Sequence, residues 1–187
     1  MGKAFGNRKK ESERPQNDFY QTPKCMTWEL LKLNLFNKNQ TILDPCCGQY
    51  AISNILKENG FNVDAKDIIY GDDFLRSNKK YDVIVMNPPF KIWDNFIIKA
   101  KECASIVCSI GKVNFFGSHK RNITNIWSHL RYIYIYDRQI AYDKPFREDG
   151  KVECGMLVSG WFIWDMNYNG YPELHILDMQ QYILKKI

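Results

Sequence analysis

The residues best suited to chemistry stand at 87–90, where Asn87-Pro88-Pro89-Phe90 follows the apolar run 83–86. Proline has no N–H donor, so two prolines in succession cannot continue the hydrogen-bond ladder of a sheet. The residue before a proline is restricted to extended backbone, which holds Asn87 in place. The result is a rigid corner that presents an amide and a flat ring. One interpretation is a turn that only ends a strand, and the other is a pocket for a flat, polar ligand.

Acidic residues and a glycine follow the strands predicted before this corner. The first strand ends in Asp44, and Gly48 lets the backbone come close to a ligand before the next helix. The second ends near Asp67, whose carboxylate can accept both hydroxyls of a ribose. Asp73 and Phe74 then offer an edge and a face to an adenine ring. Each feature alone is more often a turn, but their order along successive strands predicts one binding site.

Hydrophobic periodicity predicts the elements that must position these residues. It indicates helices at 24–35, 51–59 and 93–104, and strands at 41–44, 61–68, 81–86 and 105–110. Their alternation predicts an α/β fold with a mostly parallel, doubly wound sheet, in which ligands bind beyond the carboxyl ends of the strands. Further strands are predicted at 130–142, 156–166 and 171–178. The turn signal "NYNG" between the last two predicts a C-terminal antiparallel hairpin.

Length and composition suit one domain. The chain has 187 residues, of which 45% are hydrophobic, and a formal net charge of +5. That size allows a proper core, and the mildly basic balance fits nucleic acid without requiring it. Residues 1–17 are predicted to be a flexible basic tail and 18–187 a single domain. No apolar run is long enough for a membrane span, and the six cysteines lack C-x-x-C pairs. We therefore expect a cytoplasmic protein with reduced thiols, no metal and no membrane contact.

The motifs "DFYQTP", "ILDPCCG", "DAKDI", "GDDFL" and "NPPF" resemble, in that order, those of the S-adenosyl-L-methionine-dependent DNA adenine-N6 methyltransferases, especially short phage-type enzymes. The resemblance covers most of 18–187. It implies a Rossmann-like class I methyltransferase fold, S-adenosyl-L-methionine as cofactor, and adenine in DNA as target. It implies cofactor-binding residues at the methionine end, in the loop beneath it, and at the ribose and adenine: Tyr20, Thr22 and Pro23; Asp44, Cys46 and Gly48; Asp67, Asp73 and Phe74. It also implies a pocket for the flipped base formed by Asn87, Pro88, Pro89 and Phe90.

One residue departs from the family pattern. The glycine loop of the family usually reads D-P-x-x-G-x-G, and Tyr50 stands here in place of the second glycine. Its side chain either crowds the cofactor or points away from it.

Basic residues and a tryptophan interleave at 115–131, namely Lys120, Arg121, Trp127 and Arg131. This mixture suits contact with a nucleic-acid backbone, so 115–156 is a candidate for a small target-recognition segment. The alternative is that 115–131 packs on the sheet through its apolar residues.

The sequence leaves several functions in competition. The leading one is methyl transfer to adenine N6 in DNA by a monomer. The same motif occurs in RNA methyltransferases, so adenine in RNA is an alternative target. A catalytically inactive, methyltransferase-like nucleic-acid-binding protein is a second alternative, which Tyr50 favours and the intact "NPPF" opposes. A protein-glutamine methyltransferase is a distant third, because that family prefers Tyr after the two prolines.

Overall fold

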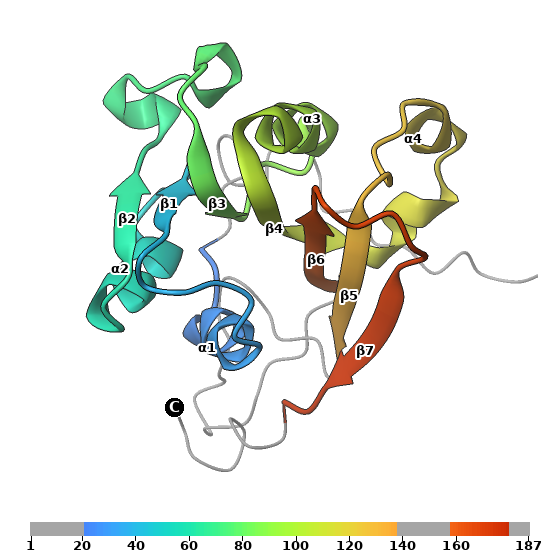
Figure 1. Cartoon of the computed structure of the whole chain (residues 1–187), viewed down its shortest axis with the longest axis horizontal. Helices are drawn as coiled ribbons and strands as arrows, with labels where there is room; N and C mark the ends of the chain where they lie inside the picture. The colour runs from blue at the N-terminus through green and yellow to red at the C-terminus, as the bar shows by residue number, and fades with distance from the viewer. Residues whose placement is uncertain (1–20, 138–157, 180–187) are drawn as a thin grey trace, which may run out of the picture.

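A computed structural model of the chain describes residues 21–137 and 158–179, which form a sheet of seven strands with helices on both faces (Figure 1). The spatial order of the strands is β2-β1-β3-β4-β6-β5-β7. In chain order they are β1 (Thr41–Asp44), β2 (Asn62–Ala65), β3 (Tyr81–Met86), β4 (Ala104–Lys112), β5 (Leu130–Tyr136), β6 (Ser159–Asp165) and β7 (Glu173–Leu177). The predicted tail at 1–17, Tyr20, and the part of the 115–156 segment beyond 137 lie outside the described residues.

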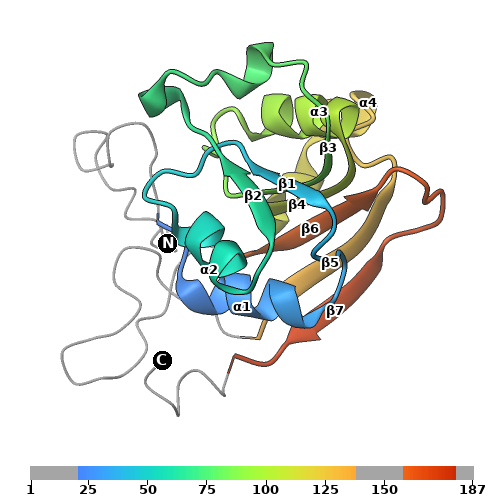
Figure 2. The same ribbon diagram turned by 60° about the vertical axis from the view of Figure 1, so that its left-hand side comes forward.

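Helices cover both faces of the sheet. They are α1 (Lys24–Lys32), α2 (Ala51–Glu58), α3 (Trp93–Cys103) and α4 (His119–Ile123), with short 3-10 turns η3 (Ile68–Tyr70), η4 (Phe74–Arg76) and η5 (Val113–Gly117). Figures 1 and 2 show α1 and α2 together on one face, with α3 and α4 on the other. Two buried cores result, one on each face. The predicted doubly wound α/β architecture is confirmed.

The first four strands place the switch point of the fold. β1 pairs in parallel with β2 on one side and with β3 on the other, and β3 pairs in parallel with β4. From β1 the chain moves to β2 and then returns across β1 to form β3. The order in which strands are added therefore reverses between β1 and β3. In open α/β sheets, ligands bind beyond the carboxyl ends of the strands at such a switch point.

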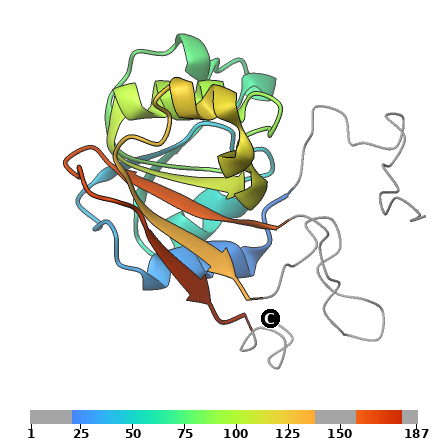
Figure 3. The same cartoon turned by 90° about the vertical axis from the view of Figure 1, so that its right-hand side faces the viewer.

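The predicted C-terminal hairpin is wrong. β6 is antiparallel to both β4 and β5, so both of its edges are occupied. The chain after β6 must therefore find another partner, and β7 pairs in parallel with the outer edge of β5, with Ile133 opposite Leu174 (Figure 3). The turn chemistry of "NYNG" predicted a reversal of direction, which occurs, but not which strand would be the neighbour.

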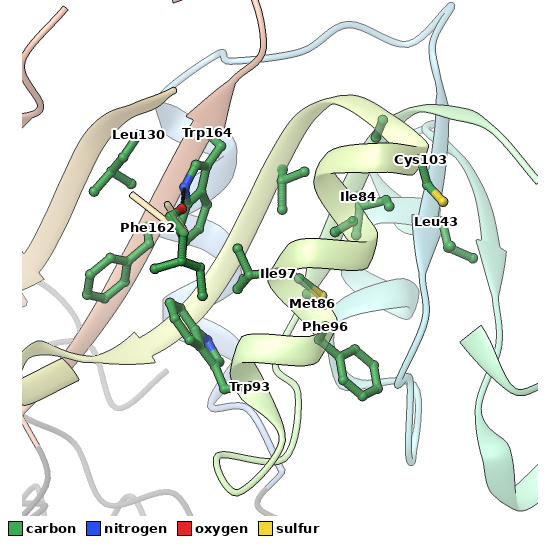
Figure 4. Packing of buried hydrophobic residues seen from close by; sticks show 14 of the residues in the cluster. Leu43, Ile84, Met86, Trp93, Phe96, Ile97, Cys103, Leu130, Phe162 and Trp164 are labelled. Carbon is green, nitrogen blue, oxygen red and sulfur yellow. Dashed lines mark hydrogen bonds between the residues drawn. The ribbon is translucent and has the colours of Figure 1, made fainter. Parts of the chain in front are cut away.

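The core between the sheet and α3 fixes the corner at 87–90. Figure 4 shows Trp93 at the start of α3 close to Phe162 of β6, with Met86 and Ile97 beside them. The Trp93 side chain is 1% exposed, and its Nε1 donates to the Ile110 carbonyl oxygen at 2.8 Å. Because Trp93 follows Phe90 by three residues, this anchor on β4 limits how far the corner can move.

Within the described ranges, no helix has both the length and the apolar character needed to cross a membrane. The five cysteines there are free thiols, and no cluster of His, Cys, Asp or Glu side chains in that part of the chain could hold a metal ion.

Candidate active site

A cavity of about 830 Å³ opens at the carboxyl ends of β1 and β3. Most of the residues implied as cofactor-binding or catalytic line it: Thr22, Asp44, Cys46, Gly48, Asp67, Asp73, Phe74, Asn87, Pro88, Pro89 and Phe90. Among the described residues of this set, Pro23 does not line the cavity; it is the N-cap of α1. The structure thus brings separate segments of the sequence to one place, and the roles of these residues stay predictions.

The corner at 87–90 is held from two sides. The Asn87 Nδ2 donates to the Thr22 Oγ1 at 3.0 Å, which ties the amide to the segment before α1. The ring of Phe90 meets Phe115 edge-on, with 6.0 Å between the ring centres. Lys112 Nζ lies 4.4 Å from the centre of the Phe90 ring. An amide, a ring and a cation therefore stand together at this end of the cavity.

Asp44 forms the buried floor of the cavity. Its side chain is 1% exposed, and Ser53 Oγ on α2 donates to its Oδ2 at 2.6 Å. Its Oδ1 is buried without a hydrogen-bond partner among the described residues. Burial, assisted by the charge of Asp67, raises the pKa of Asp44 to about 7. An acceptor of this kind is suited to a cationic ligand, because a cation would both supply the missing partner and favour the ionised form.

The raised pKa of Asp44 predicts an unusual pH dependence of stability. The folded chain keeps a proton on this group between its ordinary pKa of 3.8 and about 7, where the unfolded chain has lost it. The contribution of Asp44 to stability is therefore complete below about pH 4 and is lost as the pH rises to about 7. We expect the stability of Asp44→Asn relative to wild type to increase by about 2–3 kcal/mol from pH 5 to pH 8, at about 1.4 kcal/mol per pKa unit. Urea unfolding at the two pH values measures this, and an unchanged difference would show that Asp44 titrates normally.

Asp67 connects the glycine loop to η3. Its Oδ2 accepts from the Gly48 N–H at 2.9 Å, and its Oδ1 accepts from the Ile69 N–H at 3.1 Å. Gly48 has φ 49°, and its carbonyl accepts from the Tyr70 hydroxyl at 3.0 Å. Each carboxylate oxygen has a further lone pair, so Asp67 can still accept from a ligand while it is held in position.

Tyr50 does not line the cavity. It caps the start of α2 with φ 62°, a left-handed conformation that glycine adopts without strain. Its ring stacks on Tyr70, with 5.7 Å between the ring centres and 11° between the planes. The residue that departs from the family pattern is therefore packed beside the cavity and does not crowd it.

The segment Asp73-Phe74 closes another side of the cavity. The Asp73 carboxylate caps η4 by accepting from the Leu75 N–H at 3.1 Å, and it pairs with Arg76 at 3.2 Å. The Phe74 ring is 6% exposed and packs against Phe96 of α3, with 5.6 Å between the ring centres. Phe96 also lines the cavity.

Sequence reasoning missed the apolar rim of the cavity. Ile68, Ile69, Tyr70 and Ile92 all line it, with exposed fractions of 69%, 61%, 53% and 41%. Three of them directly follow Asp67. The sequence did contain a signal for this rim: large apolar residues directly follow Asp67, a candidate ligand-binding carboxylate. A flat ligand needs apolar walls of this kind.

The predicted nucleic-acid segment is largely packed. Arg121 Nε donates to Asp94 Oδ1 at 2.6 Å, and its guanidinium lies 4.0 Å from the centre of the Phe115 ring. Trp127 stacks on Phe116 at 4.4 Å. Lys120, in contrast, is exposed.

Arg131 lies at the other end of the sheet. It pairs with Asp165 at 2.8 Å, and Asp165 stands opposite Ile106 near the start of β4. Lys112, whose Nζ lies over the Phe90 ring, is at the end of the same strand. The four residues predicted to bind nucleic acid thus do not form one surface, and their role stays a prediction.

Neither a protein-family model nor a curated protein matches this sequence. Solved structures match it in fold. A protein assigned as an RNA methyltransferase from Pyrococcus horikoshii is 16% identical, with a TM-score of 0.55 over 82% of this chain and 88% of its own.

Two proteins of type I restriction-modification systems also match. A protein assigned as a modification subunit from Vibrio vulnificus YJ016 is 11% identical, with a TM-score of 0.56 over 84% of this chain and 47% of its own. A methyltransferase subunit from Streptococcus thermophilus is 11% identical, with a TM-score of 0.57 over 87% of this chain and 48% of its own. This chain spans about half the length of these two proteins. At such identities the likeness concerns the fold, and this chain has the Rossmann-like fold of class I methyltransferases.

Proposed function

We propose that this chain transfers a methyl group from S-adenosyl-L-methionine to the N6 amino group of adenine in DNA, after the base is flipped into the cavity. The observation that carries the proposal is the position of 87–90. Its amide and ring line the same cavity as the acidic loops after β1 and β2, at the switch point of the sheet. This arrangement supports a cofactor site next to a site for a flat polar base.

The cavity fits the cofactor. Its volume of about 830 Å³ lies towards the upper end of the range for small-molecule sites, about 300–1,000 Å³. The buried Asp44 Oδ1 without a partner suits the cationic methionine end. Asp67 offers acceptors to the ribose hydroxyls, and Ile68 and Ile69 offer exposed apolar walls to the adenine. The cofactor, when bound, supplies an electrophilic methyl group on a sulfonium.

The corner at 87–90 offers hydrogen-bond acceptors that can make the N6 amine of adenine more nucleophilic. The exocyclic nitrogen of adenine is a poor nucleophile, because its lone pair is delocalised into the ring. Acceptors from the Asn87 side chain and the Pro88 carbonyl can bind both amino hydrogens and favour a tetrahedral nitrogen. The nitrogen lone pair would then face the methyl group that the cofactor supplies, and the cofactor's sulfur would keep the electron pair of the C–S bond. The extra proton leaves to solvent, and catalysis rests on positioning.

Phe90 is suited to hold the flipped base. Stacking on an aromatic side chain contributes about 1–3 kcal/mol per base. That is comparable to the few kcal/mol that extruding a base from a duplex costs. The adjacent prolines limit the entropy lost when the base binds, because the corner is already rigid.

The charges around the cavity favour a polyanionic substrate. Asp67, Asp72 and Asp73 lie on the side of the glycine loop, whereas Lys91 and Lys112 lie at the corner. A nucleic acid approaching the corner would meet the exposed Lys91. This distribution supports a nucleic acid over a protein substrate.

Adenine in RNA is the second candidate target. The match with a protein assigned as an RNA methyltransferase extends over 88% of that chain, compared with about half for the restriction-modification proteins. The corner itself reads the base and not the sugar, so it serves either polymer.

Transfer of labelled methyl groups to DNA and to RNA, followed by mass spectrometry of the nucleosides, tests the proposal. We expect N6-methyladenine in DNA. Label in RNA alone would assign the second target. No transfer to either polymer, with nucleic-acid binding retained, would identify a catalytically inactive binding protein.

The lysines near the corner should determine how DNA binding depends on salt. We expect replacing the exposed Lys91 and Lys120 by Gln to lower the slope of log affinity against log salt by about 0.9 for each lost phosphate contact. Arg131→Gln is the matched control, because Arg131 lies at the opposite end of the sheet. Fluorescence anisotropy over a salt series measures the slopes, and a larger fall in the Arg131 variant would place DNA on that end.

A further inference from the structure

We infer that Thr22 is a positioning residue, which orients the side-chain amide of Asn87 so that its oxygen is presented to the target amine. The inference rests on the proposed function and gives Thr22 a role different from the cofactor contact that the family resemblance implies. It begins from one hydrogen bond, in which Asn87 Nδ2 donates to Thr22 Oγ1 at 3.0 Å.

The direction of this hydrogen bond matters. A side-chain amide has a donor end and an acceptor end that diverge from the same carbon. Only the acceptor end can bind an amino hydrogen of adenine, and a half-turn of the amide would present two hydrogens to it instead. Because Asn87 Nδ2 donates to Thr22, Asn87 Oδ1 is turned away from Thr22. Asn87 itself lines the cavity.

Thr22 is itself firmly placed. Its side chain is 5% exposed, and Pro23 after it restricts its backbone to extended conformations. The Pro23 carbonyl accepts from the Met26 N–H at 3.0 Å at the start of α1. The Met26 carbonyl in turn accepts from Trp161 Nε1 of β6 at 2.9 Å. A hydroxyl fixed through α1 to the sheet is thus one of the contacts that hold the amide of Asn87, which directly follows β3, and in this structure the hydroxyl accepts from Nδ2.

Thr22→Val tests this, because it keeps the shape of the side chain and removes the hydrogen-bond acceptor. We expect kcat to fall about tenfold, while KM for DNA and the Kd for S-adenosyl-L-methionine stay within about twofold, since a hydrogen bond of about 1–1.5 kcal/mol is lost. Thr22→Ser should restore most of kcat. Thr27→Val is the matched control: Thr27 is buried on α1, and its Oγ1 has no hydrogen-bond partner among the described residues. It should leave kcat unchanged.

A measurement without turnover separates this inference from the proposed function. In 15N-labelled protein the side-chain amide signals of Asn87 are identified by their absence in Asn87→Ala. We expect hydrogen exchange of this amide to be faster in Thr22→Val and unchanged in Thr27→Val. Unchanged exchange in Thr22→Val, or a weakened cofactor Kd with normal kcat, would overturn the positioning role. Faster exchange with no methyl transfer by wild type would instead overturn the proposed function alone.

Discussion

We expect Asn87→Ala to reduce methyl transfer by about two to three orders of magnitude and to leave cofactor affinity nearly unchanged. Removing one donor or acceptor aimed at the reacting group in a preorganised site costs about 10²–10³ in kcat. The amide is held by Thr22 and by the two prolines after it, so a water molecule cannot reproduce its geometry. Single-turnover transfer of labelled methyl to an adenine-containing duplex measures the chemical step, and calorimetry measures the cofactor Kd.

Two further variants make this result specific. Asn87→Asp keeps acceptor oxygens at the same position, so it should lose less activity than Asn87→Ala. Asn95→Ala removes an exposed amide from α3 and should match wild type. Near-normal single-turnover rates in Asn87→Ala would mean that the corner only ends a strand.

The fold was predictable as far as local patterns determine it. The helix at 93–103 and the strands at 41–44 and 81–86 were predicted within one residue, because the helix has a clear amphipathic period and each strand is a short, mostly apolar run. The pairing of β7 was not predictable, since the edge that a strand joins depends on which edges are already occupied. The pattern of residues along the chain predicts the length and direction of a strand. Its neighbours in the sheet are known only once the sheet is assembled.

The meeting of the candidate site residues was predictable where they follow strand ends. Asp44, Asp67 and Asn87 line one cavity because parallel strands bring their carboxyl ends to one edge of the sheet. The hydrogen bond between Thr22 and Asn87 spans 65 residues and has no local signature. The same holds for Lys112, whose position over Phe90 depends on the packing of β4 beside β3.

For the basic residues, sequence reasoning proposed a nucleic-acid contact where the fold instead supplies an acidic partner. Arg121 suggested a nucleic-acid contact from its neighbours in the sequence, but it pairs with Asp94 at the first turn of α3. Sequence gives the charge of a side chain and not the partner that neutralises it. The exposed Lys91 and Lys120 therefore carry the electrostatic part of the proposal.

The second large expected effect is the loss of cofactor affinity in Asp67→Ala, and Asp72 provides its control. Both carboxylates line the cavity, but that of Asp72 pairs with Lys66 at 2.6 Å and is 42% exposed. Asp72→Ala should change the cofactor Kd by less than about threefold, because exposed ion pairs contribute little.

Asp67→Ala should weaken binding of S-adenosyl-L-methionine by at least about a hundredfold. Two ribose hydroxyls would lose a charged acceptor, and hydrogen bonds to charged groups contribute about 1.5–3 kcal/mol each, against about 1.4 kcal/mol for a tenfold change in Kd. The variant also frees the N–H groups of Gly48 and Ile69, so the glycine loop is no longer tied to η3. Calorimetry with the purified variant measures the Kd, and circular dichroism establishes that it is folded. A folded Asp67→Ala protein that binds the cofactor like wild type would show that this carboxylate only connects two loops, and the ribose would then need another acceptor in the cavity.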